Sequence, residues 1–314
     1  EIYGGPLRML SAPDARATLR AVNARLENER FRPRDSDGNV GGLLELPEWI
    51  TPIIVGDLHA QVDNLLRILS EGAYLESLER GEAALILLGD AVHSQQPGQW
   101  DDMDSSVLMM DLILKLKLRF PDRVFFLLGN HDSFSAEVTK GGVPQGLLWE
   151  KRLGELRGEE YTRALELFYR RSPLVVVSRD FVACHAGPPR TRVSKQTLID
   201  IRRFPKLLRE LTWTRIQRTT HPAGYTRRDV RQLRQALGLP DTAAVIVGHF
   251  PVSKVGAVWR HVGNIRNHHI VYSANPREIG LFTRVSGKLV AQTYPAEACS
   301  DWLNRRAAAT APPT

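Results

Sequence analysis

Cysteine is scarce in this chain of 314 residues, which has only Cys184 and Cys299. Two cysteines are too few for a disulfide framework or a cysteine-based zinc site, so a reducing compartment is favoured. No stretch approaches the roughly 20 apolar residues of a membrane-spanning helix. The segment from Glu1 to Leu10 also lacks the basic and then apolar pattern of a signal peptide. We therefore expect a cytoplasmic protein with no membrane partner, and leave open a targeting segment upstream of Glu1.

Long runs of one charge and internal repeats are also absent. Lys and Arg number 42 against 35 Asp and Glu, a net charge of +7, but the basic residues are scattered along the chain. This pattern favours a solvated surface over a nucleic-acid interface, while the net charge suits an anionic substrate. Hydrophobic residues make up 43% and charged residues 25%, which excludes a largely disordered or fibrous chain. Nothing in the composition indicates the oligomeric state.

The chain divides into an N-terminal extension, a main body and a short tail. Residues 11–30 have the spacing of an amphipathic helix, and the stretch from Pro33 to Gly42 ends it. We assign residues 1–45 to a helical extension, 46–300 to the main domain, and 301–314, rich in Ala, Thr and Pro, to a disordered tail. A long helical pattern makes about 140–172 a helical insertion in the main domain.

Apolar runs and helical patterns alternate through the first half of the main domain. Strands are predicted at 50–55, 83–88 and 124–128, with helical patterns at 62–78 and 107–119 between them. This alternation is typical of an α/β sheet. Further strands are predicted at 174–177, 181–184 and 245–247, with a helix at 230–237 before the last of these. The last third consists of short β-rich segments that indicate a meandering sheet.

Polar residues follow the predicted strands where each strand ends. They are Asp57 and His59, Asp90, Asn130 and His131, His185, and His249. Ligands of open α/β sheets bind at this edge, because side chains from several strands meet there. A glycine precedes the first polar residue in four of the five cases, which predicts sharp turns that aim these side chains into a crevice.

Carboxylates, an amide oxygen and imidazoles in one crevice are suitable ligands for a pair of divalent cations. One carboxylate can bridge both ions, and such a pair can activate water for phosphoryl transfer. Nitrogen and oxygen ligands without sulfur favour Mn, Fe or Zn over Ca or Mg. We expect two divalent ions, with Mn²⁺ preferred and Fe or Zn as alternatives.

Five short motifs occur in a recognisable order: Gly56-Asp57-Leu58-His59, Gly89-Asp90, Gly129-Asn130-His131-Asp132, His185-Ala186-Gly187 and Gly248-His249. Together they resemble the motif set of the calcineurin-like metallophosphoesterases, and most closely the phosphoprotein phosphatase branch with its small bacterial and phage members. The resemblance implies a four-layer αββα fold, in which a central mixed β-sandwich is flanked by helices. Phe250 and Pro251 follow the last motif where many other branches have a second metal-binding histidine.

The resemblance also implies a role for each motif residue. Asp57, His59 and Asp90 would hold the first metal, and Asp90, as the bridging ligand, would hold the second together with Asn130, His185 and His249. His131 would be the general acid that protonates the leaving oxygen. Asn130 and His131 would also contact the substrate phosphate, and the nucleophile would be a hydroxide between the metals.

One further match and one departure concern the phosphate pocket. Arg215, in Trp213-Thr214-Arg215, resembles an arginine that grips the phosphate in the bacterial and phage enzymes. After the bridging aspartate, however, His93 and Ser94 stand where the family has an aspartate that orients the catalytic histidine and an arginine that binds phosphate. We expect His93 to contact His131 or the phosphate. Residues considered as replacements are, for the cation, Arg190, Arg192 and Lys195, and, for the carboxylate, Asp102 and Asp104.

The function predicted from these residues is hydrolysis of phosphomonoesters, with phosphoserine or phosphothreonine in proteins as the first choice of substrate. Two alternatives to this function stay open. The first is a phosphohydrolase for a small nucleotide, such as a dinucleoside polyphosphate or a cyclic nucleotide, and the second is a metal-binding scaffold or regulator with weakened catalysis.

Overall fold

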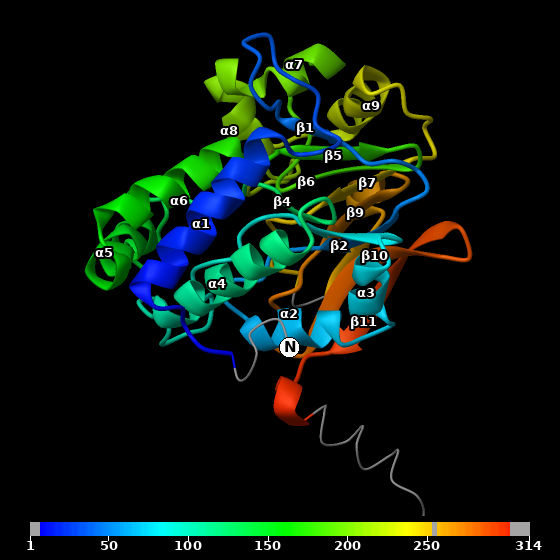
Figure 1. Cartoon of the computed structure of the whole chain (residues 1–314). Coiled ribbons are helices and arrows are strands. Elements are labelled where there is room, and N and C mark those ends of the chain that lie inside the picture. Colours follow the sequence, from blue (N-terminus) through cyan, green and yellow to red (C-terminus); the bar gives the residue numbers. More distant parts are fainter. Residues whose placement is uncertain (1–6, 253–255, 302–314) are drawn as a thin grey trace, which may run out of the picture.

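The computed structural model describes residues 7–252 and 256–301, and within them the strands form two sheets packed face to face (Figure 1). The first sheet has the order β11-β10-β2-β3-β4. Strands β2, β3 and β4 run parallel, and β10 joins them and β11 in antiparallel pairs. Their bounds are β2 Thr51–Val55, β3 Ala83–Leu87, β4 Val124–Phe126, β10 Glu278–Val285 and β11 Lys288–Pro295.

The second sheet is also mixed and has the order β1-β5-β6-β7-β9-β8. Parallel pairs join β1 to β5, β6 to β7 and β7 to β9, whereas β5–β6 and β8–β9 are antiparallel. Its strands are β1 Leu43–Glu45, β5 Val175–Ser178, β6 Phe181–Cys184, β7 Ala244–Val247, β8 Val258–Arg260 and β9 His268–Val271.

Alternate residues of the central strands fill two different layers of the core. Ile54 and Ile86 belong to the cluster between the sheets, together with Ile246 of the second sheet. Their neighbours Ile53 and Leu85 point the other way and pack under helices. Both faces of these strands are therefore buried, which explains why they read as continuous apolar runs and not as alternating ones.

Helices cover the outer face of each sheet. The cluster outside the first sheet combines strand residues with residues from α1 Ala12–Glu27, α2 Val62–Leu69, α3 Tyr74–Glu79, α4 Asp104–Arg119, α5 Gln145–Arg157 and α6 Glu159–Arg171. The cluster outside the second sheet includes residues of α7 Lys195–Ile199, α8 Pro205–Trp213 and α9 Arg227–Ala236. The four-layer αββα sandwich expected from the motifs is thus confirmed. No helix of the described residues is both long enough and apolar enough to cross a membrane.

The predicted helical insertion consists of two helices, since Gly158 has a φ of 84° and separates α5 from α6. Helix α1 of the N-terminal segment packs against α4, α5 and α6 (Figure 1). The start of the chain therefore lies beside the predicted insertion, from which it is distant in sequence. The predicted tail falls almost wholly outside the described residues, which end at 301.

The single meander predicted for the last third is wrong. Strands β8 and β9 belong to the second sheet, where β9 pairs parallel to β7, and the β10–β11 hairpin belongs to the first sheet. The chain crosses between the sheets at 272–277. Turn residues mark where strands end but do not specify a strand's partner, so local signals could not reveal this crossing.

A buried ion pair joins the insertion to α4. Nη1 and Nη2 of Arg157 donate hydrogen bonds to Oδ1 (2.7 Å) and Oδ2 (2.6 Å) of Asp111. The side chains of Arg157 and Asp111 are 2% and 0% exposed. We expect Asp111→Ala to lower the free energy of unfolding by about 3–5 kcal/mol, because it leaves a buried guanidinium unpaired. The exposed pair Arg152–Asp104 provides the control, and Asp104→Ala should cost less than about 1 kcal/mol. Equal losses in urea unfolding of the two variants would contradict the prediction.

Candidate active site

Five strands bring the predicted polar residues to one edge of the sandwich. Asp57 and His59 follow β2, Asp90 follows β3, Asn130 and His131 follow β4, His185 follows β6, and His249 follows β7. All except His185 line a cavity of about 510 Å³. His185 lies directly beneath it, with Nε2 3.0 Å from Oδ1 of Asn130. The structure therefore brings together every motif residue that the sequence singled out.

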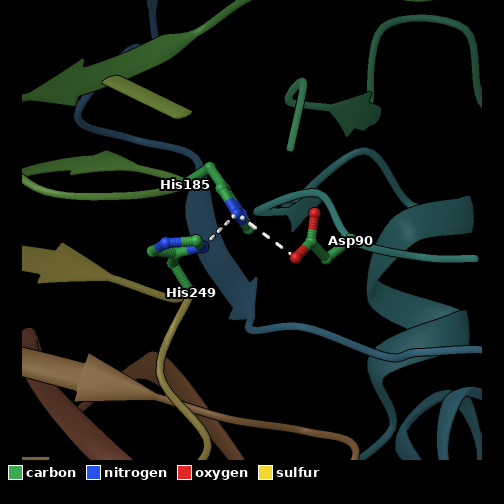
Figure 2. Close-up of side chains that lie close together, drawn as sticks. All are labelled: Asp90, His185 and His249. Atoms are coloured by element: carbon green, nitrogen blue, oxygen red, sulfur yellow. Dashed lines mark hydrogen bonds and ion pairs between the residues drawn. The ribbon is translucent and has the colours of Figure 1, made fainter. Parts of the chain in front are cut away.

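Two groups of potential metal ligands share Asp90. Asp57, His59 and Asp90 form one group, and Asp90, His185 and His249 form the other; within each, the ligand atoms lie within 4.8 Å of one another. Figure 2 shows the second group, in which Nε2 of His185 lies 3.4 Å from Oδ2 of Asp90 and 3.2 Å from Nδ1 of His249. Asp90 stands between the groups, where a bridging ligand would have to be.

The hydrogen bonds behind the imidazoles determine which nitrogens face the cavity. Nδ1 of His185 lies 2.9 Å from the carbonyl oxygen of Leu88. A carbonyl can only accept, so this bond places the proton on Nδ1 and leaves a lone pair on Nε2. Nδ1 of His59 is held in the same way, 3.3 Å from the carbonyl of Val92.

Lone pairs of neighbouring nitrogen and oxygen atoms therefore point toward one another in this site. Nε2 of His185 faces oxygens of Asn130 and Asp90 at 3.0 and 3.4 Å, and none of these atoms has a proton to share when the carboxylate is ionised. Such an arrangement is repulsive unless a cation lies between the atoms. The donor set of these residues thus fits divalent metal ions bound by nitrogen and oxygen.

Burial dominates the electrostatics of the site in the metal-free chain. Desolvation raises the pKa of Asp57 to about 7 and also raises that of Asp90, where Asp132 adds to the effect. Desolvation likewise lowers the pKa of the His59 imidazole to about 3 and that of His185 below its usual value. Neutral imidazoles are the form that binds metal, whereas the carboxylates must lose their protons when a cation binds.

Several of these residues adopt the left-handed backbone conformation that side chains usually avoid. His59, Asp90 and His249 have φ values of 43°, 50° and 63°, a conformation that clusters at functional sites. The prediction that the preceding glycines make the sharp turns is correct in this respect only for Gly89, with a φ of 95°. At the other three positions glycine is required because a side chain would not fit. An added Cβ on Gly248 would collide with the Asp57 carboxylate, and those on Gly56 and Gly129 would also collide with close neighbours.

Asp132 is a structural residue of the site that the sequence reasoning did not single out. Oδ2 of Asp132 accepts hydrogen bonds from the backbone N–H groups of Asp90 (2.7 Å) and Gly129 (2.9 Å), and Oδ1 accepts one from Ala91 (3.1 Å). It thereby ties the loop after β3 to the loop after β4. The available signal was an acidic residue directly after His131 in the third motif.

His131 has an imidazole partner and not a carboxylate. Its Nδ1 lies 3.2 Å from Nδ1 of His93, a fully buried residue whose Nε2 has no hydrogen-bond partner among the described residues. The ring of His93 is perpendicular to that of Trp149. Desolvation lowers the pKa of His93 to about 3 and holds the pKa of His131 well below its usual value.

The residues considered as replacements for the missing side chains lie elsewhere. Asp102 accepts bonds from residues 104 and 105, and Asp104 pairs with Arg152 at 2.7 Å, so neither supplies a carboxylate to His131. Lys195 pairs with Glu45, and Arg190 and Arg192 line a different cavity. The prediction for Asp102 and Asp104 is wrong because their side chains bond groups at the start of α4 and on α5 instead. Residues 190–195 follow β6 and do not line the active-site cavity, so the three basic residues do not replace the missing cation.

Two cationic side chains do line the cavity, Arg215 and Lys140. The guanidinium of Arg215 lies over the ring of Phe250, with 5.2 Å between its Cζ and the ring centroid, and its Nε is 3.3 Å from His249. Lys140 is in a tight turn with Val143, and no carboxylate of the described residues lies within 4 Å of its Nζ. No local pattern indicates a role for Lys140, since a lone lysine in a Gly-rich turn resembles any surface lysine.

Comparison with known proteins finds a matching family, two relatives of similar sequence, and solved structures of similar fold. Residues 50–271 match the family model described as Calcineurin-like phosphoesterase. The serine/threonine-protein phosphatase PP2A-like PPG1 of Candida albicans is 30% identical over 151 residues, 46% of this chain and 32% of that protein. A putative serine/threonine-protein phosphatase of Schizosaccharomyces pombe is 36% identical over 92 residues, 29% of this chain and 26% of that protein. The chain thus spans a third or less of the length of these relatives.

Among solved structures, a protein serine/threonine phosphatase from Saccharomyces cerevisiae, with similarity to human phosphatase PP5, aligns with a TM-score of 0.66. The alignment covers 92% of this chain and 91% of that chain at 15% identity. A cold-active protein-tyrosine phosphatase of a Shewanella species aligns with a TM-score of 0.52 over 81% of this chain and 82% of that chain, at 14% identity. At these identities the likeness concerns the fold.

Proposed function

We propose that this chain, which belongs to the calcineurin-like phosphoesterase family, is a metal-dependent phosphatase that hydrolyses phosphomonoesters, first of all phosphoserine or phosphothreonine in proteins. The observation that carries the proposal is the set of converging lone pairs around Asp90. The similarity to serine/threonine phosphatases supports the choice of a phosphoprotein substrate.

In this proposal Asp57 and His59 would hold one divalent cation, Asn130, His185 and His249 would hold a second, and Asp90 would be a ligand of both. Mn²⁺ is preferred, with Fe or Zn as alternatives, because the ligands are nitrogen and oxygen without sulfur. Such cations would activate a water molecule as the nucleophile and would neutralise phosphate charge.

The remaining groups of the cavity bind the phosphate and supply a proton. Arg215 and Lys140 offer positive charge to the phosphate oxygens. His131 lies at the cavity wall with Nδ1 against His93, which leaves Nε2 for the leaving oxygen.

The proposal is tested by measuring metal content by mass spectrometry together with turnover of p-nitrophenyl phosphate and bis-p-nitrophenyl phosphate. We expect about two Mn²⁺ ions per chain and chelator-sensitive hydrolysis that is faster for the monoester. Preference for the diester or for a dinucleoside polyphosphate would instead support the nucleotide hydrolase, and two metals without any turnover would support the scaffold. A chain that binds no metal would contradict the site itself.

Lys140 offers a sharper check on the phosphate pocket. Lys140→Ala should raise the KM for p-nitrophenyl phosphate by about tenfold, since a hydrogen bond to a charged group contributes about 1.5–3 kcal/mol. It should weaken inhibition by inorganic phosphate by a similar factor. The exposed Lys288, outside the cavity, provides the matched control as Lys288→Ala. An unchanged KM and unchanged phosphate inhibition would remove Lys140 from the pocket.

A further inference from the structure

A second cavity of about 860 Å³ lies beside the candidate active site and is lined by arginines. Arg190 and Arg192 come from the loop after β6, and Arg228 comes from the first turn of α9. The other lining residues are mostly uncharged polar side chains such as Gln217 and Gln232. We call this cavity the arginine groove.

The positive charge of the arginine groove is not neutralised from within. Asp229 is the one carboxylate among the described residues that line it, and its Oδ2 already accepts hydrogen bonds from N (2.7 Å) and Oγ1 (2.8 Å) of Thr226. In the described part of the chain, no carboxylate lies within 4 Å of the guanidinium groups of Arg190, Arg192 or Arg228. All three arginines are exposed, so their charge is available to an anion.

The short segment Ala223-Gly224 separates the arginine groove from the active site. Gly224 lines both cavities. Ala223 lines the active site, and its carbonyl oxygen accepts a hydrogen bond from Nη1 of Arg190 at 3.0 Å. A chain in extended conformation advances about 3.3 Å per residue, so a peptide held at the active site reaches past this segment within a few residues.

We propose that the arginine groove binds an acidic segment of the phosphoprotein substrate, rich in carboxylates or further phosphates, next to the residue that is dephosphorylated. This inference rests on the proposed function and adds a rule of substrate choice to it. The lining favours a peptide over a nucleic acid, because none of the described residues that line the groove is aromatic and bases would have no stacking platform. Arginine forks suit carboxylate and phosphate oxygens equally well.

The test compares two phosphoserine peptides that differ only in their flanks, one with glutamates and one with glutamines. The variant is Arg192→Glu/Arg228→Glu, which leaves Arg190 and its bond to the active-site wall intact. The control is Arg277→Glu/Lys288→Glu, which changes net charge equally at exposed positions outside the groove. Turnover of p-nitrophenyl phosphate monitors the active site in every protein.

The native chain should prefer the glutamate peptide, and the groove variant should raise the KM for that peptide by about tenfold. The KM for the glutamine peptide and turnover of p-nitrophenyl phosphate should not change, and the control variant should behave like the native chain. Equal KM values for the two peptides in the native chain, or an equal loss in the control variant, would overturn the proposal.

Binding of the same peptides, labelled with a fluorophore and followed by anisotropy without added metal, separates this inference from the proposed function. A preference for the glutamate peptide that disappears in the groove variant supports the groove even where no ester is hydrolysed. Failure of p-nitrophenyl phosphate turnover in the native chain would contradict the proposed function alone. Binding of a single-stranded oligonucleotide in preference to the acidic peptide would overturn the proposal.

Discussion

Asp90→Asn should remove bound metal from both halves of the site and lower turnover of p-nitrophenyl phosphate by more than about a hundredfold. Asp90 is the one residue shared by the two ligand groups. Asparagine keeps the shape of the side chain, and its oxygen still accepts the backbone N–H of His131, which bonds Oδ1 of Asp90 at 2.8 Å. The substitution therefore removes the charge and one metal-binding oxygen while leaving the loop in place.

Metal content is best measured at pH 8. Burial raises the pKa of Asp57 to about 7 in the metal-free chain, so below that pH protons compete with cations for the carboxylate, whereas above it the carboxylate is free to bind. Asp101→Asn, at an exposed position outside the cavity, is the matched control and should retain both metals. Two bound metals and native turnover in Asp90→Asn would show that the cations bind elsewhere.

The sequence indicated where the proposed metal ligands meet better than where the proposed substrate-binding residues lie, for a physical reason. Asp57, Asp90 and His185 each follow a buried strand, and parallel strands converge at their carboxyl ends, so local patterns determine where these side chains meet. Lys140 comes from a turn, and the arginine groove combines the loop after β6 with helix α9, so their positions depend on packing between distant segments. No local pattern encodes that packing.

The same difference between local patterns and packing of distant segments explains the errors in the predicted fold. Strand positions could be predicted from apolar runs, but the crossing of the chain from β9 to β10 could not, because each strand end carries the same turn signals. Asp102 and Asp104 are close to His93 in sequence, yet the start of α4 carries them away from His131. Proximity in sequence was a poor guide there.

Because His131 contacts His93 and not a carboxylate, we expect a second large effect. Loss of the His131 side chain should lower the rate of hydrolysis by an amount that depends on the leaving group of the substrate. Burial lowers the pKa of His93 to about 3, so His93 is neutral and cannot stabilise a positive charge on His131 as a carboxylate would. His131→Ala should reduce turnover of an alkyl phosphate such as phosphoserine by about a hundredfold, the lower end of the usual range for a general acid. The loss should be smaller for p-nitrophenyl phosphate, whose leaving oxygen is weakly basic and needs little protonation. Metal content should not change, and His261→Ala, at an exposed position, is the control.

His93→Asp is the reciprocal experiment, because it restores a negative charge beside Nδ1 of His131. It should raise the pKa of His131 and speed hydrolysis of phosphoserine peptides more than that of p-nitrophenyl phosphate, which narrows the gap between the two substrates. Thermal unfolding must accompany the kinetics, since the new carboxylate is placed where His93 is fully buried against Trp149. If a folded, metal-loaded His93→Asp protein keeps the native ratio of rates for the two substrates, His93 does not govern proton donation by His131. Equal losses on both substrates in His131→Ala would likewise assign His131 to phosphate binding instead of proton transfer.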